Sequence, residues 1–367
     1  MRLKALDGLR GIAALVVLVH HSLLVVPSLA APYFGGSEGG GRAGLLVNTP
    51  LHLLWAGTEA VYLFFVLSGL VLAFSLRSGS FQWSSYFPSR FARLYLPVFG
   101  AVALGAVVMA LTPDARPDDS LWARHRPGDY DLPAILADLT LVGGTSIRIT
   151  PLWSLQWEVV FSALLPLYIY ASRRLHVALQ LGIFFALATL GAYANVASLK
   201  YLPMFGIGVA LASVWDALSD RLASMPRRRA AVSWVPALAV AVLLVTSFWT
   251  LRKVLPADLA PAVTLPLILV GICLLIIGAA NAPLLSDVLS GRVFGFLGLI
   301  SFSLYLVHEP LVMAVAAVVP SPAMVVFVAL PLSIVVAVGF WLAIERPSHR
   351  LSRRIRRGVE YEHRLAA

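Results

Sequence analysis

The sequence has few charged residues and almost no cysteine. Asp, Glu, Lys and Arg make up 13% of the 367 residues, whereas hydrophobic residues make up 59%. This composition lies outside the usual range of soluble domains and predicts an integral membrane protein. The single cysteine, Cys273, excludes a disulfide framework or a cysteine metal site within one chain.

Several common catalytic motifs are also missing. The chain has no P-loop, and it has no GxSxG elbow or dinucleotide fingerprint in a strand–helix context. No two histidines stand four residues apart on a helix, and the adjacent His20 and His21 point to different faces. We therefore expect no metal cofactor.

Ten apolar segments are long enough to cross the roughly 30 Å hydrocarbon core of a membrane. With the N-terminus inside, 20 of the 28 Lys and Arg residues fall on the cytoplasmic side, which favours N-in and C-in topology. The net charge of +10 then indicates topology and contact with anionic lipid, not a nucleic-acid surface. We expect an all-α, multi-pass protein of the cytoplasmic membrane without a fused soluble domain. The expected segments are 9–28, 51–75, 94–112, 152–171, 176–195, 200–216, 232–250, 261–280, 294–317 and 323–344.

The first segment carries ionisable residues inside an apolar run. In LDGLRGIAALVVLVHH (6–21), His21 follows Arg10 by eleven residues. At about 100° and 1.5 Å per residue, the two side chains share a helix face and lie about 16 Å apart. Such a histidine marks a functional path or is packed and hydrogen-bonded between helices. The two histidines and the charged flank argue against a cleaved signal peptide, so we expect this helix to be retained.

The next two segments carry a carboxylate and a pair of arginines. Glu59, in GTEAVYLFFVLSG (57–69), either lines a polar cavity or pairs with a basic loop residue. Arg90 and Arg93 stand three residues apart, which places both on one helix face. They are suited to gripping an anionic group such as phosphate, although ordinary cytoplasmic anchoring is the alternative.

A serine and a glutamate share a face of the segment that begins near residue 152. Ser154 and Glu158 are four residues apart in LWSLQWEVVFSALLPLY (152–168). A buried carboxylate beside an imidazole orients it and raises its basicity, while a structural Ser–Glu hydrogen bond is the competing account.

A second membrane histidine occurs in LGLISFSLYLVHEPLV (297–312). Helical rise places His308 in the outer half of the membrane, at a depth comparable with His21 and Glu158. We expect Tyr305, one turn earlier, to face the same space and Glu309 to lie at its rim. Titratable groups from three helices at one depth predict a site there.

Taken together, these stretches resemble the membrane-bound acyltransferase family 3, whose members O-acylate sugars of polysaccharides, peptidoglycan and antibiotics. LDGLRGIAALVVLVHH matches the family's first-helix pattern, in which an arginine is followed by ten residues and then a histidine; here these are Arg10 and His21. GTEAVYLFFVLSG, the paired arginines, WSLQWE, SFSLYLVHEP and IERP (344–347) follow in the family's order. Tyr62 is a departure, because many members have an acid two residues before FF, and this leaves the role of Glu59 open.

The resemblance implies a donor and a sidedness. The donor would be acyl-CoA, most often acetyl-CoA, which reaches into the membrane from the cytoplasm. Arg90 and Arg93, with Arg10, would hold its anionic nucleotide end. The acceptor would be a hydroxyl of a carbohydrate or glycosylated molecule.

The catalytic roles follow from the same resemblance and from imidazole chemistry. His21 would be the general base, Glu158 would orient it, and Ser154 would position Glu158. His308 would stabilise the oxyanion or support the acceptor. A covalent acyl-histidine intermediate is a variant of this mechanism.

Two other classes of function compete with the enzyme. A transporter or flippase for a glycan, lipid-linked sugar or proton-coupled solute would use His21, Glu158 and Glu59 as a relay. No inverted repeat supports it. A structural partner of a biosynthetic complex would not explain titratable groups at one depth. We expect residues 1–345 to form the transmembrane acyltransferase domain, with 346–367 a basic tail along the inner membrane surface.

Overall fold

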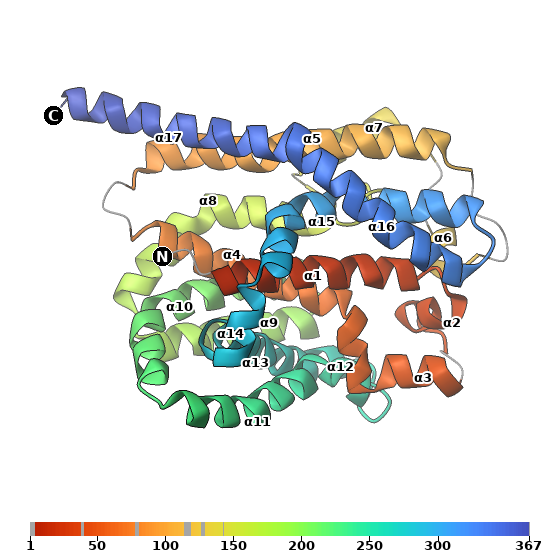
Figure 1. Cartoon of the computed structure of the whole chain (residues 1–367), viewed down its shortest axis with the longest axis horizontal. Coiled ribbons are helices and arrows are strands. Elements are labelled where there is room, and N and C mark those ends of the chain that lie inside the picture. Colours follow the sequence, from red (N-terminus) through yellow and green to blue (C-terminus); the bar gives the residue numbers. More distant parts are fainter. Residues whose placement is uncertain are drawn as a thin grey trace. The chain divides into compact units, whose positions relative to one another are not determined.

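The protein is described by a computed structural model in which the ordered elements are helices (Figure 1). Within the described residues there is no β-strand. The described residues are 4–37, 40–77, 81–113, 119–125, 129–141 and 143–366, with side chains described as far as Arg357. Parts of the expected outer loop and of the basic tail therefore lie outside the described residues.

The elements are α1 (Lys4–Leu23), α2 (Pro27–Ala30), η1 (Ala31–Phe34), α3 (Gly41–Asn48), η2 (Pro50–Trp55), α4 (Gly57–Ser75), α5 (Trp83–Leu111), α6 (Leu121–Arg124), α7 (Leu132–Thr140), α8 (Leu152–Arg174), α9 (Val177–Tyr193), α10 (Ala197–Ala223), α11 (Arg227–Val245), α12 (Ser247–Leu251), α13 (Ala260–Asn281), α14 (Pro283–Leu289), α15 (Arg292–Val318), α16 (Pro322–Phe340), the π-helical turn η3 (Trp341–Glu345) and α17 (Arg346–Ala366).

The expected all-α membrane fold is confirmed. Nine helices of the described ranges are long and apolar enough to cross a membrane. The segment expected at 176–195 forms α9, which has 17 residues and spans only about 25 Å at 1.5 Å per residue. It is therefore shorter than the roughly 30 Å core that the other spans can cross.

The chain divides into two compact units, and each is assembled from three separate stretches. Unit 1 comprises Met1–Val17, Gly39–Leu76 and Leu164–Leu299. Unit 2 comprises Leu18–Glu38, Arg77–Ala163 and Ile300–Ala367. That residues 1–345 form one transmembrane acyltransferase domain stays a prediction.

Unit 1 is held together by helices whose backbones approach closely at glycine. A Cβ atom on Gly69 of α4 would lie 2.0 Å from the carbonyl oxygen of Phe205 in α10, and one on Gly208 would lie 2.0 Å from that of Val66. Small residues allow this contact in membrane proteins, where packing and not hydrophobicity drives helix association. The α4–α10 interface therefore has no space for a side chain at either position.

Unit 2 contains the continuous run from α16 through η3 into α17. The π-helical turn ends at the buried Glu345, whose carboxylate accepts hydrogen bonds from the backbone N–H of Ser303 at 3.1 Å and from its hydroxyl at 2.5 Å. Because Ser303 belongs to α15, this carboxylate ties α15 to the start of α17. π-Turns often occur at such functionally constrained positions.

Helix α5 begins earlier than the apolar pattern predicts. The segment was expected at 94–112, but the helix runs from Trp83 to Leu111. Arg90 and Arg93 end the apolar run in the sequence without ending the helix. Arg90 is accommodated because it is buried against polar partners on α8, described below.

The glycine contact in unit 1 predicts a strong difference between two matched substitutions. Gly208→Ala forces α4 and α10 apart and should lower the free energy of unfolding by about 1–3 kcal/mol. Gly182→Ala in α9 is the control, since its Cβ meets no atom within 4 Å. Thermal unfolding of the detergent-purified protein, followed by tryptophan fluorescence, measures both. Equal stability of the two variants would contradict the packing described here.

Candidate active site

A pair of histidines from α1 and α15 lies within unit 2. Nδ1 of His21 is 2.8 Å from Nε2 of His308, and the ring centroids are 4.9 Å apart. His308 is fully buried and His21 is partly buried. The structure thus brings together the two histidines that the sequence placed at one depth.

The hydrogen bonds of this pair determine where the protons are. Nδ1 of His308 lies 2.9 Å from the carbonyl oxygen of Leu304, one turn earlier in α15. A carbonyl only accepts, so this Nδ1 carries a proton. In a neutral, buried His308 the other nitrogen, Nε2, is then an acceptor, and Nδ1 of His21 donates to it. The lone pair of His21 is consequently on Nε2.

Aromatic residues hold the histidines of α1 in different environments. Trp122 of α6 stacks on His21, with ring centroids 5.6 Å apart and planes inclined by 24°. The adjacent His20 is buried and contacts Tyr33 of η1, whose hydroxyl is 3.5 Å from Nδ1 of His20. Trp122 was not predicted, because it lies in a long loop that carries no helical periodicity.

Ser154 has a different partner from the one expected. Its hydroxyl donates to the carbonyl oxygen of Pro151 at 2.9 Å and lies 2.7 Å from the hydroxyl of Tyr305. The Tyr305 hydroxyl is 3.2 Å from the same carbonyl. The predicted hydrogen bond from Ser154 to Glu158 is therefore replaced by a Ser154–Tyr305 contact. Four-residue spacing places two residues on one face but does not make them partners.

Glu158 forms a salt bridge with one of the two predicted donor-binding arginines. Nη2 of Arg90 donates to Oε1 of Glu158 at 2.5 Å, and its Nε donates to the hydroxyl of Ser162 at 3.1 Å. The Ser162 hydroxyl in turn donates to the Glu158 carbonyl oxygen at 2.6 Å. The expected contact between Glu158 and His21 stays a prediction. Ser162, four residues after Glu158, was missed because its neighbours in sequence are apolar.

The second predicted arginine, Arg93, is half-buried on α5, one turn after Ser89. Arg90 is the buried member of the pair and Arg93 the more accessible one. The two arginines, treated alike in the sequence, thus differ in their surroundings.

Glu309 was expected at the rim of the site, but it is fully buried. Its carboxylate accepts hydrogen bonds from the hydroxyl of Thr150 and, at 2.6 Å, from the backbone N–H of Thr150. Thr150 stands two residues before α8, so Glu309 fixes the entry of that helix against α15. A full pair of donors explains how a carboxylate is tolerated at this position.

Two predicted site residues belong to unit 1. Arg10 is half-buried on α1. Glu59 is buried on α4, and its Oε1 accepts a hydrogen bond from Nε1 of Trp249 at 3.1 Å. His52 stacks on the same indole, with ring centroids 4.3 Å apart. Glu59 was expected either to line a polar cavity or to pair with a basic loop residue. The structure shows a hydrogen-bond partner for it, but this partner is the aromatic Trp249 and not a basic residue.

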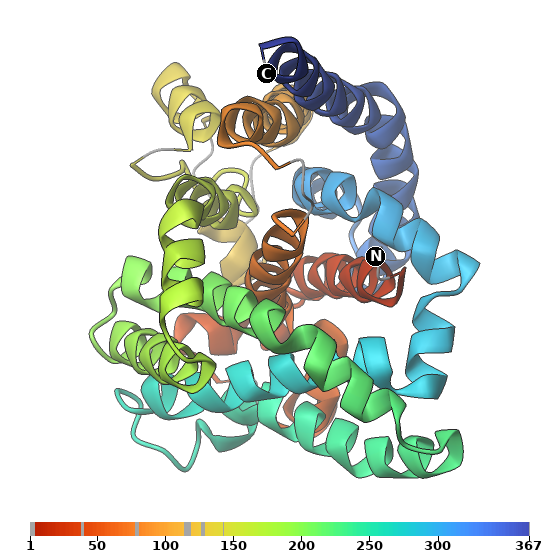
Figure 2. The same ribbon diagram turned by 90° about the vertical axis from the view of Figure 1, so that its left-hand side faces the viewer.

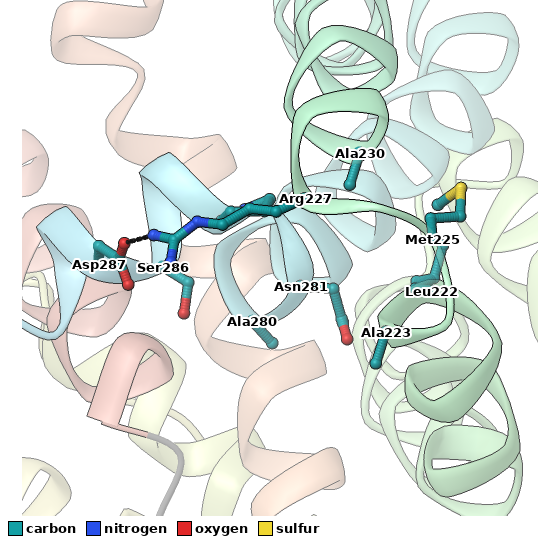
Figure 3. Close-up of a pocket in the computed structure, with 10 residues that line it drawn as sticks. Leu222, Ala223, Met225, Arg227, Ala230, Ala280, Asn281, Ser286 and Asp287 are labelled. Carbon is teal, nitrogen blue, oxygen red and sulfur yellow. Dashed lines mark hydrogen bonds and ion pairs between the residues drawn. The ribbon is translucent and has the colours of Figure 1, made fainter.

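A pocket of about 290 Å³ in unit 1 contains none of the predicted site residues. Figure 3 shows Arg227 reaching across it to form an ion pair with the exposed Asp287. Its lining comes from the ends of α10 and α13 and the starts of α11 and α14. The pocket is thus not the predicted active site.

Comparison with known proteins decides the family. A model described as an acyltransferase domain matches residues 3–346. The chain belongs to the membrane-bound acyltransferase family 3. The resemblance drawn from the motifs is therefore confirmed.

Two curated relatives of the chain are informative. The chain is 31% identical over 178 residues to acyltransferase MdmB of Streptomyces mycarofaciens, an alignment that spans 48% of this chain and 42% of MdmB. It is 25% identical over 370 residues to O-acetyltransferase PaAT-1 of Phomopsis amygdali, which spans 83% of this chain and 71% of PaAT-1. No solved structure matches the chain.

The Arg90–Glu158 ion pair predicts that substitutions of its two residues are not additive. Arg90→Gln leaves the half-buried Glu158 carboxylate without this cation and should cost about 1–3 kcal/mol of stability. Arg90→Gln combined with Glu158→Gln should cost much less than the sum of the single changes. Thermal unfolding of the four proteins in detergent measures the coupling, and simple additivity would contradict the ion pair.

Proposed function

We propose that the protein moves a short acyl group, first of all acetyl, from acyl-CoA to a hydroxyl of a carbohydrate or glycosylated acceptor. Family membership supports acyl transfer. The Phomopsis relative is named an O-acetyltransferase, which supports an acetyl donor and an oxygen acceptor. The observation that carries the proposal is the hydrogen bond between His21 and His308.

His21 acts as the general base through Nε2. This nitrogen takes the proton of the acceptor hydroxyl as the hydroxyl oxygen attacks the thioester carbonyl. The tetrahedral adduct collapses by breaking the carbon–sulfur bond, and the proton passes from His21 to the departing thiolate. The products are the ester and free CoA. An acyl-histidine relay, in which the same lone pair attacks the thioester first, remains the variant mechanism.

His308 takes the part that a carboxylate plays in a serine–histidine–acid array. It accepts the Nδ1 proton of His21, which fixes the tautomer and the ring orientation. When His21 becomes an imidazolium, this hydrogen bond becomes charge-assisted and stronger. The face of Trp122 over the ring also favours the cationic form. Oxyanion stabilisation, the role first expected for His308, is replaced in this proposal by orientation of the base.

Ser154 and Tyr305 act as positioning residues in this proposal. Their two hydroxyl protons serve the contact between them and the contact with the Pro151 carbonyl. Neither proton is directed at a reacting atom in this arrangement. The pair instead joins α8 to α15 three residues before His308.

The donor is held by cations in the first part of α5. The diphosphate and 3′-phosphate of CoA suit guanidinium groups, which bind phosphate through paired N–H donors. Arg93 is the more accessible arginine and would contact the donor directly. Arg90 forms an ion pair with Glu158 and is the buried member of the two. Arg10 belongs to unit 1, and its contact with the donor stays a prediction of the family resemblance. The proposal places the donor in the cytoplasm and the protein in the cytoplasmic membrane.

The transporter or flippase remains the alternative class. Buried titratable side chains suit a relay as well as an enzyme. We favour the enzyme because the acyltransferase model matches residues 3–346, which include both histidines of the pair.

Substitution of His21 tests the proposed function directly. His21→Ala should lower turnover by about 10²–10⁴-fold, the usual contribution of a general base. The assay follows release of CoA from acetyl-CoA by the protein in nanodiscs, with a panel of glycosides as acceptors. His125→Ala is the control, since His125 is exposed after α6 and stacks on Phe34. Full turnover by the His21 variant would exclude the assigned base.

A further inference from the structure

The pocket of unit 1 lies where four helices end or begin. The ends of α10 and α13 and the starts of α11 and α14 surround it, and the two ribbon views show these elements side by side (Figures 1 and 2). Helix α13 has 22 residues and spans about 33 Å at 1.5 Å per residue, close to the roughly 30 Å of the hydrocarbon core. Asn281, the last residue of α13, lines the pocket, so the pocket lies at the boundary of the membrane.

Three consecutive arginines open α11 at this boundary. Arg227, Arg228 and Arg229 form its first turn and are exposed, and within the described part of the chain Arg228 and Arg229 have no ion-pair partner. No side chain caps this helix start, so its first backbone N–H groups add to the positive potential. Because basic residues mark the cytoplasmic side, the pocket faces the inner leaflet in the topology that the sequence predicts.

The ion pair across the pocket leaves most of the Arg227 guanidinium available. Arg227 contacts Asp287 through Nη2, and the two side chains are 72% and 65% exposed. An ion pair that is this exposed contributes little to stability, because water screens it. Among the described residues, the other N–H groups of Arg227 meet no acceptor. The pair therefore holds the guanidinium across the pocket without using up its donors.

Two further polar side chains of the pocket are open to a ligand. The Ser286 hydroxyl makes no hydrogen bond to the described residues. The Asn281 amide donates to the carbonyl oxygen of Ile277 at 2.9 Å and keeps its second N–H and its oxygen. In Figure 3, both side chains extend on the same side of the Arg227 side chain. The pocket thus offers donors that suit a phosphate group and acceptors that suit a hydroxyl.

The surroundings of the pocket are apolar as well as basic. Leu222 and Met225 line it, and both pack on the small apolar core around Trp234. Leu284 and Val288 of α14 are exposed and stand four residues apart, so they share one face of that helix next to lining residues. A soluble anion makes no use of such an apolar face, whereas the acyl chains of a lipid do. This combination favours a lipid over a soluble phosphate.

We propose that this pocket binds the headgroup of an anionic phospholipid of the inner leaflet, with the phosphate on Arg227 and the acyl chains along α14. Basic pockets between membrane helices on the cytoplasmic side suit such headgroups. Asp287 is the single acidic side chain of the lining, and the three arginines outnumber it. The inference is independent of the proposed function, since none of the predicted catalytic residues lines this pocket.

The test measures binding of phosphatidylglycerol to the full-length protein in a neutral detergent by native mass spectrometry. Arg227→Gln should raise the Kd of the tightest-bound phosphatidylglycerol about tenfold, because a charge-assisted hydrogen bond is lost. The control is Arg173→Gln, which removes an exposed positive charge near the end of α8, outside the pocket, and should bind this lipid as the wild type does. Equal affinity of the two variants would overturn the inference.

Asp287→Asn distinguishes a lipid site from a purely structural ion pair. This change removes the carboxylate that repels a phosphate, so the variant should bind phosphatidylglycerol at least as tightly as the wild type. Its effect is then opposite to that of Arg227→Gln. If both variants lose the same affinity, the ion pair only holds α11 to α14, and the pocket is not an anion site.

Two other probes establish which ligand the pocket takes. Phosphatidylcholine, which has the same phosphate but no net charge, should bind the wild type more weakly than phosphatidylglycerol, and equal affinity for the two lipids would contradict an anionic ligand. Excess inorganic phosphate should leave phosphatidylglycerol bound. If inorganic phosphate displaces the lipid, the pocket takes a soluble phosphate and the lipid assignment fails.

Discussion

The hydrogen bond between His21 and His308 is the interaction on which the account of the site depends. An imidazole in a membrane helix is stable only with polar partners, and each ring supplies one for the other. The bond also determines which ring nitrogens carry protons, because the Leu304 carbonyl accepts a hydrogen bond from Nδ1 of His308. That single acceptor, a backbone atom of the same helix, sets the tautomer of both histidines. The base at Nε2 of His21 is thus a consequence of helical geometry in α15.

Three polar contacts, one from η3 and two from the beginning of α8, hold the short part of α15 that carries His308. Glu345, at the end of η3, binds Ser303. Ser154, at the start of α8, contacts Tyr305, and Thr150 binds Glu309. The contacts of Ser303 and Tyr305 are buried and that of Thr150 is partly buried, so each hydrogen bond is costly to leave unmade. Together they constrain the rotation and translation of α15, and they therefore preorganise His308 before any substrate binds.

The sequence predicts the helices well because hydrophobic length and periodicity are local properties. It also predicts that His21 and His308 reach a common depth, since helical rise converts residue number into position. Side-chain partners are different, because they depend on how helices rotate against one another. Glu158 was expected beside an imidazole and is bound to Arg90. Glu309 was expected at the rim of the site, but it is buried and accepts a hydrogen bond from Thr150. Thr150 is a loop residue, so no helical periodicity predicts this contact. The extension of α5 past its apolar run likewise depends on tertiary partners of Arg90.

The protonation of the two histidines tests the central claim most directly. Side-chain ¹⁵N chemical shifts of the protein in nanodiscs, assigned by comparison with His21→Gln and His308→Gln, report which nitrogens carry protons. The account predicts that both histidines carry the proton on Nδ1 and leave Nε2 unprotonated at neutral pH. A proton on Nε2 of neutral His308 would contradict it, because His308 would then donate to Nδ1 of His21 and the lone pair of the base would be lost from Nε2.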